Sequence, residues 1–189
     1  MISSSAHATT TLLVFGDSLS AGYGIARDAS WPQLLQDKLM KNYPDFTVVN
    51  ASISGETTAG GLRRITPALA QHHPDIVIIE LGANDGLRGG SLTEMRKNLS
   101  LIIERVQRAH ARVLLVGMRL PPNYGKRYVD GFQNNYTRLA QQHRVTLLPF
   151  LLEGVPAEHF QPDNLHPSAD AQPRIMENIL LSLRPLLSK

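Results

Sequence analysis

Cysteine is absent from the sequence, which excludes disulfides, thiolate metal ligands and a cysteine nucleophile. No apolar stretch approaches the roughly 18 residues that a helix needs to span a bilayer, so we expect no stable membrane insertion. Long runs of like charge are missing too: 19 Lys and Arg residues stand against 16 Asp and Glu residues, and the basic ones are scattered. Without a basic patch, binding to nucleic acid is not expected.

What is present is the composition of an ordinary globular domain. The 189 residues are 42% hydrophobic and 19% charged, which suits one domain with a substantial core. We expect a single monomeric domain over residues 11–189, preceded by a disordered leader over residues 1–10. The leader lacks a basic region followed by an apolar one, so it is not a complete secretory signal. Because Ala6-His7-Ala8 has the form of a cleavage site, the tail of a signal is the other interpretation.

Strand-like and helix-like segments alternate along the chain. Short apolar, β-branched runs predict five strands, over residues 11–15, 47–50, 75–81, 112–118 and 145–148. Helical patterns between and after the strands predict five helices. One begins after the N-cap candidate Ser30 and another after the capping box that starts at Ser91. The other three cover residues 57–71, 129–142 and 173–187. This alternation predicts an α/β fold in three layers, a parallel sheet with helices on both faces.

The most informative motif, Gly16-Asp17-Ser18, directly follows the first predicted strand. Glycine lets the backbone turn sharply and lift the next side chains clear of the strand. A serine hydroxyl in that position lies at the sheet edge where open α/β folds bind ligands. Taken alone, the motif also fits an ordinary turn, and Ser20 is a second candidate for a reactive hydroxyl.

Three further sites strengthen the functional interpretation. They are Gly55 after the second strand, Gly82-Ala83-Asn84-Asp85 after the third, and Asp163-Asn164-Leu165-His166 before the last helix. Loops at the carboxyl ends of parallel strands gather at one edge of the sheet. We therefore expect these sites to converge on Ser18.

The four blocks, in this order and over nearly the whole chain from about Thr11, resemble the GDSL hydrolases, the superfamily with the Ser-Gly-Asn-His signature. The resemblance implies the flavodoxin-like strand order 2-1-3-4-5. It also implies a serine hydrolase that cleaves acyl thioesters and carboxylic esters, with acyl-CoA, lysophospholipids and aryl esters as substrates. No cofactor and no metal are implied, and the cellular location implied is the periplasm.

Within this resemblance, Ser18 is the nucleophile and His166 is the general base that activates it. A histidine titrates close to neutral pH, which suits repeated proton transfer. Asp163, three residues earlier, is expected to select the His166 tautomer that can accept the serine proton. The alternative for Asp163 is an Asx-turn that organises only its own loop.

The negative charge of the reaction intermediate needs preorganised donors. The resemblance assigns them to the backbone N–H groups of Ser18 and Gly55 and to the side-chain amide of Asn84. It also implies that an acyl groove is bordered by the loop after the fourth strand and by the loop over residues 81–89. The substrate-binding residues expected are Leu19, Arg119, Leu120, Pro121 and Tyr124.

Two other functions stay open for this sequence. One is a carbohydrate or aryl-ester deacetylase of the same fold, and the other is a non-catalytic lipid- or glycan-binding module. The complete Ser, Gly, Asn and His set argues against the binding module, because a protein that only binds has no need of all four.

Overall fold

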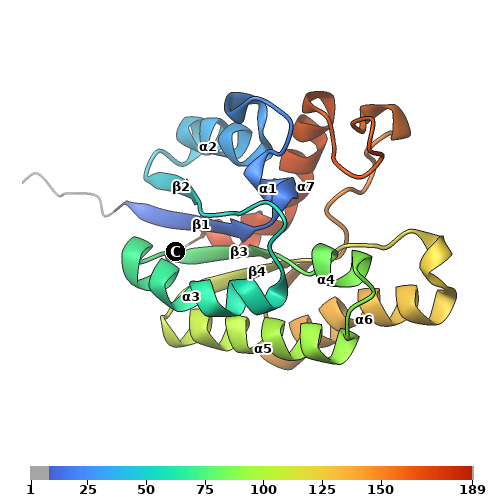
Figure 1. Cartoon of the computed structure of the whole chain (residues 1–189). Coiled ribbons are helices and arrows are strands. Elements are labelled where there is room, and N and C mark those ends of the chain that lie inside the picture. The colour runs from blue at the N-terminus through green and yellow to red at the C-terminus, as the bar shows by residue number, and fades with distance from the viewer. Residues whose placement is uncertain (1–8, 189) are drawn as a thin grey trace, which may run out of the picture.

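The computed structural model describes residues 9–188 and contains one parallel sheet of five strands (Figure 1). The strands are β1 (Thr10–Gly16), β2 (Phe46–Asn50), β3 (Ile76–Glu80), β4 (Arg112–Val116) and β5 (Thr146–Leu148). Their order is β2-β1-β3-β4-β5, and every neighbouring pair is parallel. The predicted fold class and strand order are confirmed.

Five long helices cover the two faces of the sheet. Helices α2 (Trp31–Asn42) and α7 (Gln172–Leu187) pack together on one face. Helices α3 (Thr58–His72), α5 (Leu92–Arg108) and α6 (Lys126–His143) form the other layer (Figure 1). Helices α3 and α7 match their predicted bounds within one residue, and α2 and α5 begin directly after the predicted Ser30 and Ser91. Helix α6 begins three residues earlier than predicted, because Gly125, with φ 84°, ends the preceding turn there.

Short elements that the periodicity did not predict fill the loops at the carboxyl ends of the strands. They are the one-turn helices α1 (Ser18–Ala21) and α4 (Ala83–Leu87) and the 3₁₀ turns η1 (Arg27–Ala29), η2 (Pro122–Tyr124), η3 (Ala157–His159) and η4 (Ala169–Ala171). A helix of four or five residues is too short to show an apolar stripe. Of the motif residues, Ser18 lies in α1 and Asn84 in α4, whereas Gly55 and the segment 163–166 lie in loops.

Capping side chains fix where two of the long helices begin. The side chain of Thr57 accepts from the Gly60 amide at α3, and that of Ser91 accepts from the Glu94 amide at α5. Both satisfy amides that a helix start leaves unpaired. Ser30 precedes α2 as predicted, but its hydroxyl donates to the Arg27 carbonyl instead of capping the helix.

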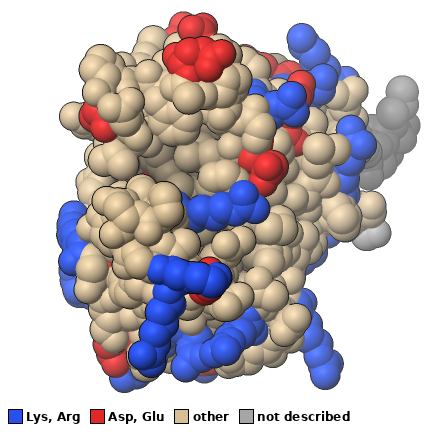
Figure 2. Space-filling view, turned by 90° about the vertical axis from the view of Figure 1, so that its right-hand side faces the viewer, with Lys and Arg blue, Asp and Glu red and all other residues tan. Residues whose placement is uncertain are grey.

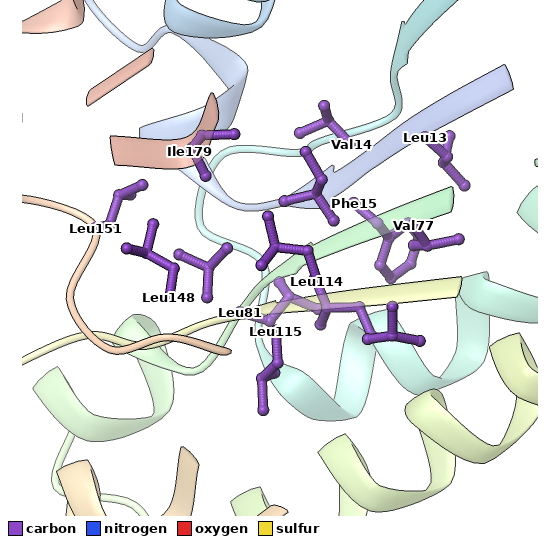
Figure 3. Close-up of a cluster of buried hydrophobic side chains, with 14 of the residues drawn as sticks. Leu13, Val14, Phe15, Val77, Leu81, Leu114, Leu115, Leu148, Leu151 and Ile179 are labelled. Carbon is purple, nitrogen blue, oxygen red and sulfur yellow. The ribbon is translucent and has the colours of Figure 1, made fainter. Parts of the chain in front are cut away.

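The core lies on both sides of β1, β3 and β4 and continues to α7 (Figure 3). Every residue of β3 is buried, and so are Leu13, Val14 and Phe15 of β1. Each such apolar side chain contributes about 1.5–3 kcal/mol on burial. The middle strands are thus the best packed part of the sheet. They anchor the turns that follow β1 and β3.

The predicted leader falls almost wholly on residues 1–8, which lie outside the described residues. The domain itself starts at Thr10, the first residue of β1, one position earlier than predicted. Within residues 9–188 no helix is long and apolar enough to cross a membrane.

Candidate active site

The turn after β1 presents Ser18 at the first position of α1. Asp17 caps this helix, because its Oδ1 accepts from the Leu19 amide at 3.0 Å. A Cβ added to Gly16 would lie 2.7 Å from an oxygen of Glu80 and from Ser20 Oγ, so only glycine fits beneath the turn. Ser20 is fully buried and donates to Glu80 at 2.7 Å, which removes the rival hydroxyl from solvent.

Ser18, His166 and Asp163 form one hydrogen-bonded chain. His166 Nε2 lies 2.9 Å from Ser18 Oγ, and His166 Nδ1 lies 2.7 Å from Asp163 Oδ2. When the imidazole carries its proton on Nδ1, this N–H donates a hydrogen bond to the Asp163 carboxylate. Nε2 is then unprotonated and can accept a hydrogen bond from the Ser18 hydroxyl. The segment before α7 therefore meets the turn after β1 across 148 residues of sequence.

Asp163 fills both roles that were considered for it. Its Oδ1 accepts from the amides of Leu165 at 2.9 Å and His166 at 3.0 Å, which is the Asx-turn, while Oδ2 holds the imidazole. The turn places Asn164 at φ 56°. The backbone N–H and then the side chain of His166 are the main causes that lower the pKa of Asp163 to about 2. The carboxyl group is thus an anion throughout the neutral range.

Two contacts join the His166 loop to the segment that follows α1. The ring of Tyr23 lies over the imidazole, with ring centroids 4.5 Å apart. Gln161 Nε2 donates to the Tyr23 carbonyl at 2.8 Å, and the Gln161 amide donates to the His166 carbonyl at 2.7 Å. Neither residue carries a recognisable sequence signal, because both contacts depend on segments far apart in the chain.

The proposed oxyanion donors come from the loops after β2 and β3. Asn84 lies in α4, and its Nδ2 donates to Asp17 Oδ2 at 3.1 Å and to the Glu56 carbonyl at 3.0 Å. Gly55 directly precedes Glu56 and has φ 78°, a conformation that favours glycine. The contact between Asn84 and Glu56 thus ties the Gly55 loop to α4, next to the turn that carries Ser18.

An apolar cavity of about 360 Å³ opens beside Ser18, Asn84 and His166. Of the predicted substrate-binding residues it is lined by Leu19, Arg119, Leu120 and Pro121. Leu87, from the loop over residues 81–89 that was expected to border the groove, lines it too, whereas sequence reasoning missed the other apolar walls, which include Met118, Phe150, Leu152, Phe160 and Leu165. Figure 2 shows a hollow on the face that holds the carboxyl ends of the strands.

Tyr124 does not line this cavity. Its hydroxyl turns away to donate to the Leu87 carbonyl at 2.8 Å, and its ring stacks on Tyr128 with centroids 6.4 Å apart. It borders a larger, more open groove of about 960 Å³ between α5 and α6, which contains none of the Ser18, Asn84 and His166 groups. The smaller cavity is the one adjacent to the reactive side chains.

The electrostatics beneath the site are dominated by two buried carboxyl groups. Burial raises the pKa of Asp17 to about 6 and that of Glu80 well above its usual range. Residues 9–188 contain no group of three or more His, Asp or Glu side chains arranged to hold a metal ion.

A serine hydroxyl paired with a carboxylate-bound histidine, at the carboxyl edge of a parallel sheet, has the geometry of a serine hydrolase. The family model described as GDSL-like lipase/acylhydrolase matches residues 14–173. This chain belongs to that GDSL-like lipase/acylhydrolase family.

Individual relatives cover almost the same length. The chain is 47% identical to esterase TesA of Pseudomonas aeruginosa, over 95% of this chain and 90% of that protein. It is 45% identical to thioesterase 1/protease 1/lysophospholipase L1 of Escherichia coli K12, over 97% and 88%. The crystal structure of psychrotrophic esterase EstA from Pseudoalteromonas sp., inhibited by monoethylphosphonate, superposes with a TM-score of 0.90 at 40% identity, over 95% of this chain and all of that one.

Proposed function

We propose that the protein hydrolyses carboxylic esters and acyl thioesters through a covalent acyl-Ser18 intermediate. The observation that carries the proposal is the 2.9 Å contact between His166 Nε2 and Ser18 Oγ, with Asp163 fixed on the other ring nitrogen. An isolated hydroxyl is a weak nucleophile and needs an adjacent base in this position. The relatives named esterase and thioesterase agree with this chemistry.

In the first half of the reaction, Ser18 Oγ attacks the acyl carbon while His166 Nε2 takes the hydroxyl proton. Asp163 stabilises the imidazolium that forms. The oxyanion is held by the amides of Ser18 and Gly55 and by Asn84 Nδ2, which turns one hydrogen from the Glu56 carbonyl to the oxyanion and keeps the other on Asp17. As the C–S or C–O bond breaks, His166 returns the proton to the departing thiol or alcohol, leaving the acyl group on Ser18.

In the second half, water attacks the acyl-Ser18 carbonyl and His166 again serves as the base. The tetrahedral intermediate uses the same donors, and its collapse breaks the bond to Ser18 Oγ. His166 returns the proton to that oxygen, and a carboxylic acid is released. The free enzyme is thereby restored.

The substrate class follows from the character of the cavity. Its walls of Leu, Met and Phe side chains suit a fatty acyl chain, and each buried methylene of substrate contributes about 0.8 kcal/mol. A deacetylase would gain nothing from such a wall, so acyl-CoA, lysophospholipid and aryl esters of fatty acids are the proposed substrates. All the catalytic groups come from one chain, in accord with a monomer, and resemblance to exported members of the family suggests action in the periplasm.

A fluorophosphonate probe tests the nucleophile. It should add one covalent mass to the wild-type protein, and Ser18→Ala should lose both the adduct and ester turnover. Ser20→Ala is the matched control and should still be labelled, because Ser20 Oγ is buried against Glu80. Labelling that survives in Ser18→Ala would refute the assignment.

A further inference from the structure

Glu80, the last residue of β3, is a fully buried carboxyl group that the proposed reaction does not use. The four residues before it in the strand are apolar and buried. In the sheet it lies opposite Gly16, directly beneath the turn that carries Ser18. A charged side chain in such a place is rare unless it is paired, so its environment calls for a physical explanation.

The contacts of Glu80 do not suit an anion. One oxygen accepts from Ser20 Oγ at 2.7 Å and from the Asp17 amide at 3.3 Å, while the other is buried with no hydrogen-bond partner. None of the ion pairs among the described residues includes Glu80. A buried carboxylate without a cation and with one bare oxygen is strongly disfavoured, and protonation removes its charge.

Asp17 is the neighbour to which a protonated Glu80 can donate a hydrogen bond. Its own carboxyl group is buried, with Oδ1 accepting from the Leu19 amide and Oδ2 accepting from Asn84 Nδ2 at 3.1 Å. The Asp17 amide contacts Glu80 Oε2 at 3.3 Å, and the other Glu80 oxygen, which has no partner, is free to donate to the Asp17 carboxylate once it carries a proton. Burial and then the charge of Asp17 raise the pKa of Glu80 well above its usual range, so Glu80 is the group of the pair that holds a proton more firmly.

Other titratable groups around the pair reinforce this division. From α6, Tyr136 is buried, and burial raises its pKa well above its usual range, so it adds no charge beside the pair. From the loop before α7, His166 lowers the pKa of Asp17. These influences favour an ionised Asp17 beside a neutral Glu80.

We propose that Glu80 is a positioning residue: a neutral acid that donates a hydrogen bond to Asp17, so that the Asp17 carboxylate keeps Asn84 Nδ2 aimed at the oxyanion site. The assignment of Asn84 as an oxyanion donor rests on the proposed function. The contact chain Glu80–Asp17–Asn84 then links the end of β3 to α4 through the nucleophile turn. Glu80 touches no substrate, and acts only through its neighbours.

Two substitutions separate the donor role from simple filling of space. Glu80→Gln keeps both a donor toward Asp17 and an acceptor for Ser20, so kcat should stay within about twofold of wild type. Glu80→Leu keeps the bulk but has no donor, and kcat should fall by about tenfold with KM little changed, the size expected for one lost hydrogen bond to a charged group. Equal losses in both variants, or no loss in Glu80→Leu, would overturn the proposal.

A pH profile adds a readout that a merely structural role would not move. Ionisation of Glu80 sets two carboxylates side by side, so wild-type kcat should decline as pH rises through the raised pKa of Glu80. Glu80→Gln cannot ionise and should hold its kcat to higher pH. Identical alkaline limbs in the two proteins would contradict a titrating Glu80.

Infrared spectroscopy measures the proton without any turnover, so it remains decisive if Glu80→Leu does not fold. At neutral pH the folded protein should show the carbonyl stretch of a protonated carboxylic acid, sensitive to deuterium exchange. Glu80→Gln should lack this band, whereas Asp17→Asn should retain it, because the proton sits on Glu80. A wild-type spectrum without the band would overturn the proposal, whereas a protein that has the band but hydrolyses no ester would contradict only the proposed function.

Discussion

Asp163→Asn changes one atom of the side chain that orients His166, and its consequence can be worked out from the loop geometry. The amides of Leu165 and His166 both point at Oδ1. An asparagine that keeps these two bonds must place its carbonyl oxygen there, which leaves its NH₂ group facing His166 Nδ1. The imidazole then has to accept at Nδ1, so its proton moves to Nε2, where it can no longer receive the Ser18 proton.

The opposite amide orientation would rescue the correct tautomer, but it is disfavoured. It points an NH₂ group at two backbone N–H groups and so loses two hydrogen bonds, each worth roughly a factor of five to ten. The combined penalty of roughly 25- to 100-fold keeps most molecules in the inactive arrangement. The lost carboxylate charge adds to this penalty because it no longer stabilises the imidazolium, so we expect kcat to fall by about 10³- to 10⁴-fold, as is typical when the orienting carboxylate of a triad becomes an amide, with KM little changed.

The assay is steady-state hydrolysis of a p-nitrophenyl ester, with thermal unfolding to check that the loop is intact. Asp170→Asn, at an exposed position in η4, is the matched control and should keep wild-type activity. Because Asn retains the two backbone contacts, the melting temperature of Asp163→Asn should stay close to wild type. Wild-type kcat in a folded Asp163→Asn protein would refute the tautomer argument and leave Asp163 with the Asx-turn role alone.

Four further outcomes follow from the same structure. Asn84→Ala should lower kcat by roughly 100- to 1000-fold with little change in KM, the usual effect of removing one oxyanion donor; steady-state kinetics on a folded variant would refute this role if only KM changed. EDTA should leave the kcat/KM for ester hydrolysis unchanged, because the proposed reaction uses only Ser18, His166 and Asp163; a loss with EDTA that zinc restores would contradict a serine mechanism. Leu120→Ala should flatten the preference for medium and long acyl chains more than it lowers acetyl-ester turnover, and a chain-length series peaking at acetyl would favour a deacetylase instead. Burial raises the pKa of Asp17 from 3.8 to about 6, so Asp17 contributes fully to the free energy of unfolding below pH 3.8, and this contribution is lost as pH rises through 6. Denaturant unfolding should therefore show a smaller fall in the free energy of unfolding over that pH interval for Asp17→Asn than for wild type, and an equal fall would contradict the raised pKa.

The sequence predicted the fold well because its main signals are local. Apolar runs bounded by turns mark β1 and β3, and amphipathic stripes mark α5 and α6. The strand order came from the resemblance, since spacing alone could not distinguish it from other doubly wound orders. The short α4 was not predicted, although its residues Asn84 and Asp85 were recognised as part of a motif.

The candidate site was only partly predictable, because its finer geometry depends on contacts between distant segments. Ser18, Asn84 and His166 stand in short motifs, and the structure brings them together. The apolar walls formed by Phe150 and Phe160 lie in irregular segments, where no periodicity marks a residue that faces a cavity. Glu80 was not singled out in the sequence, because its environment depends on the register that sets it against Gly16.

The hydrogen bond between Ser18 and His166 spans 148 residues, and this has a consequence for how the enzyme is made. A ribosome synthesises the chain from its N-terminus, so the nucleophile emerges early and its base among the last residues before α7. Every shorter nascent or truncated chain carries Ser18 without the imidazole that activates it. On the proposed mechanism, a chain that stops short of residue 166 therefore has no base for Ser18 and is expected to hydrolyse no ester.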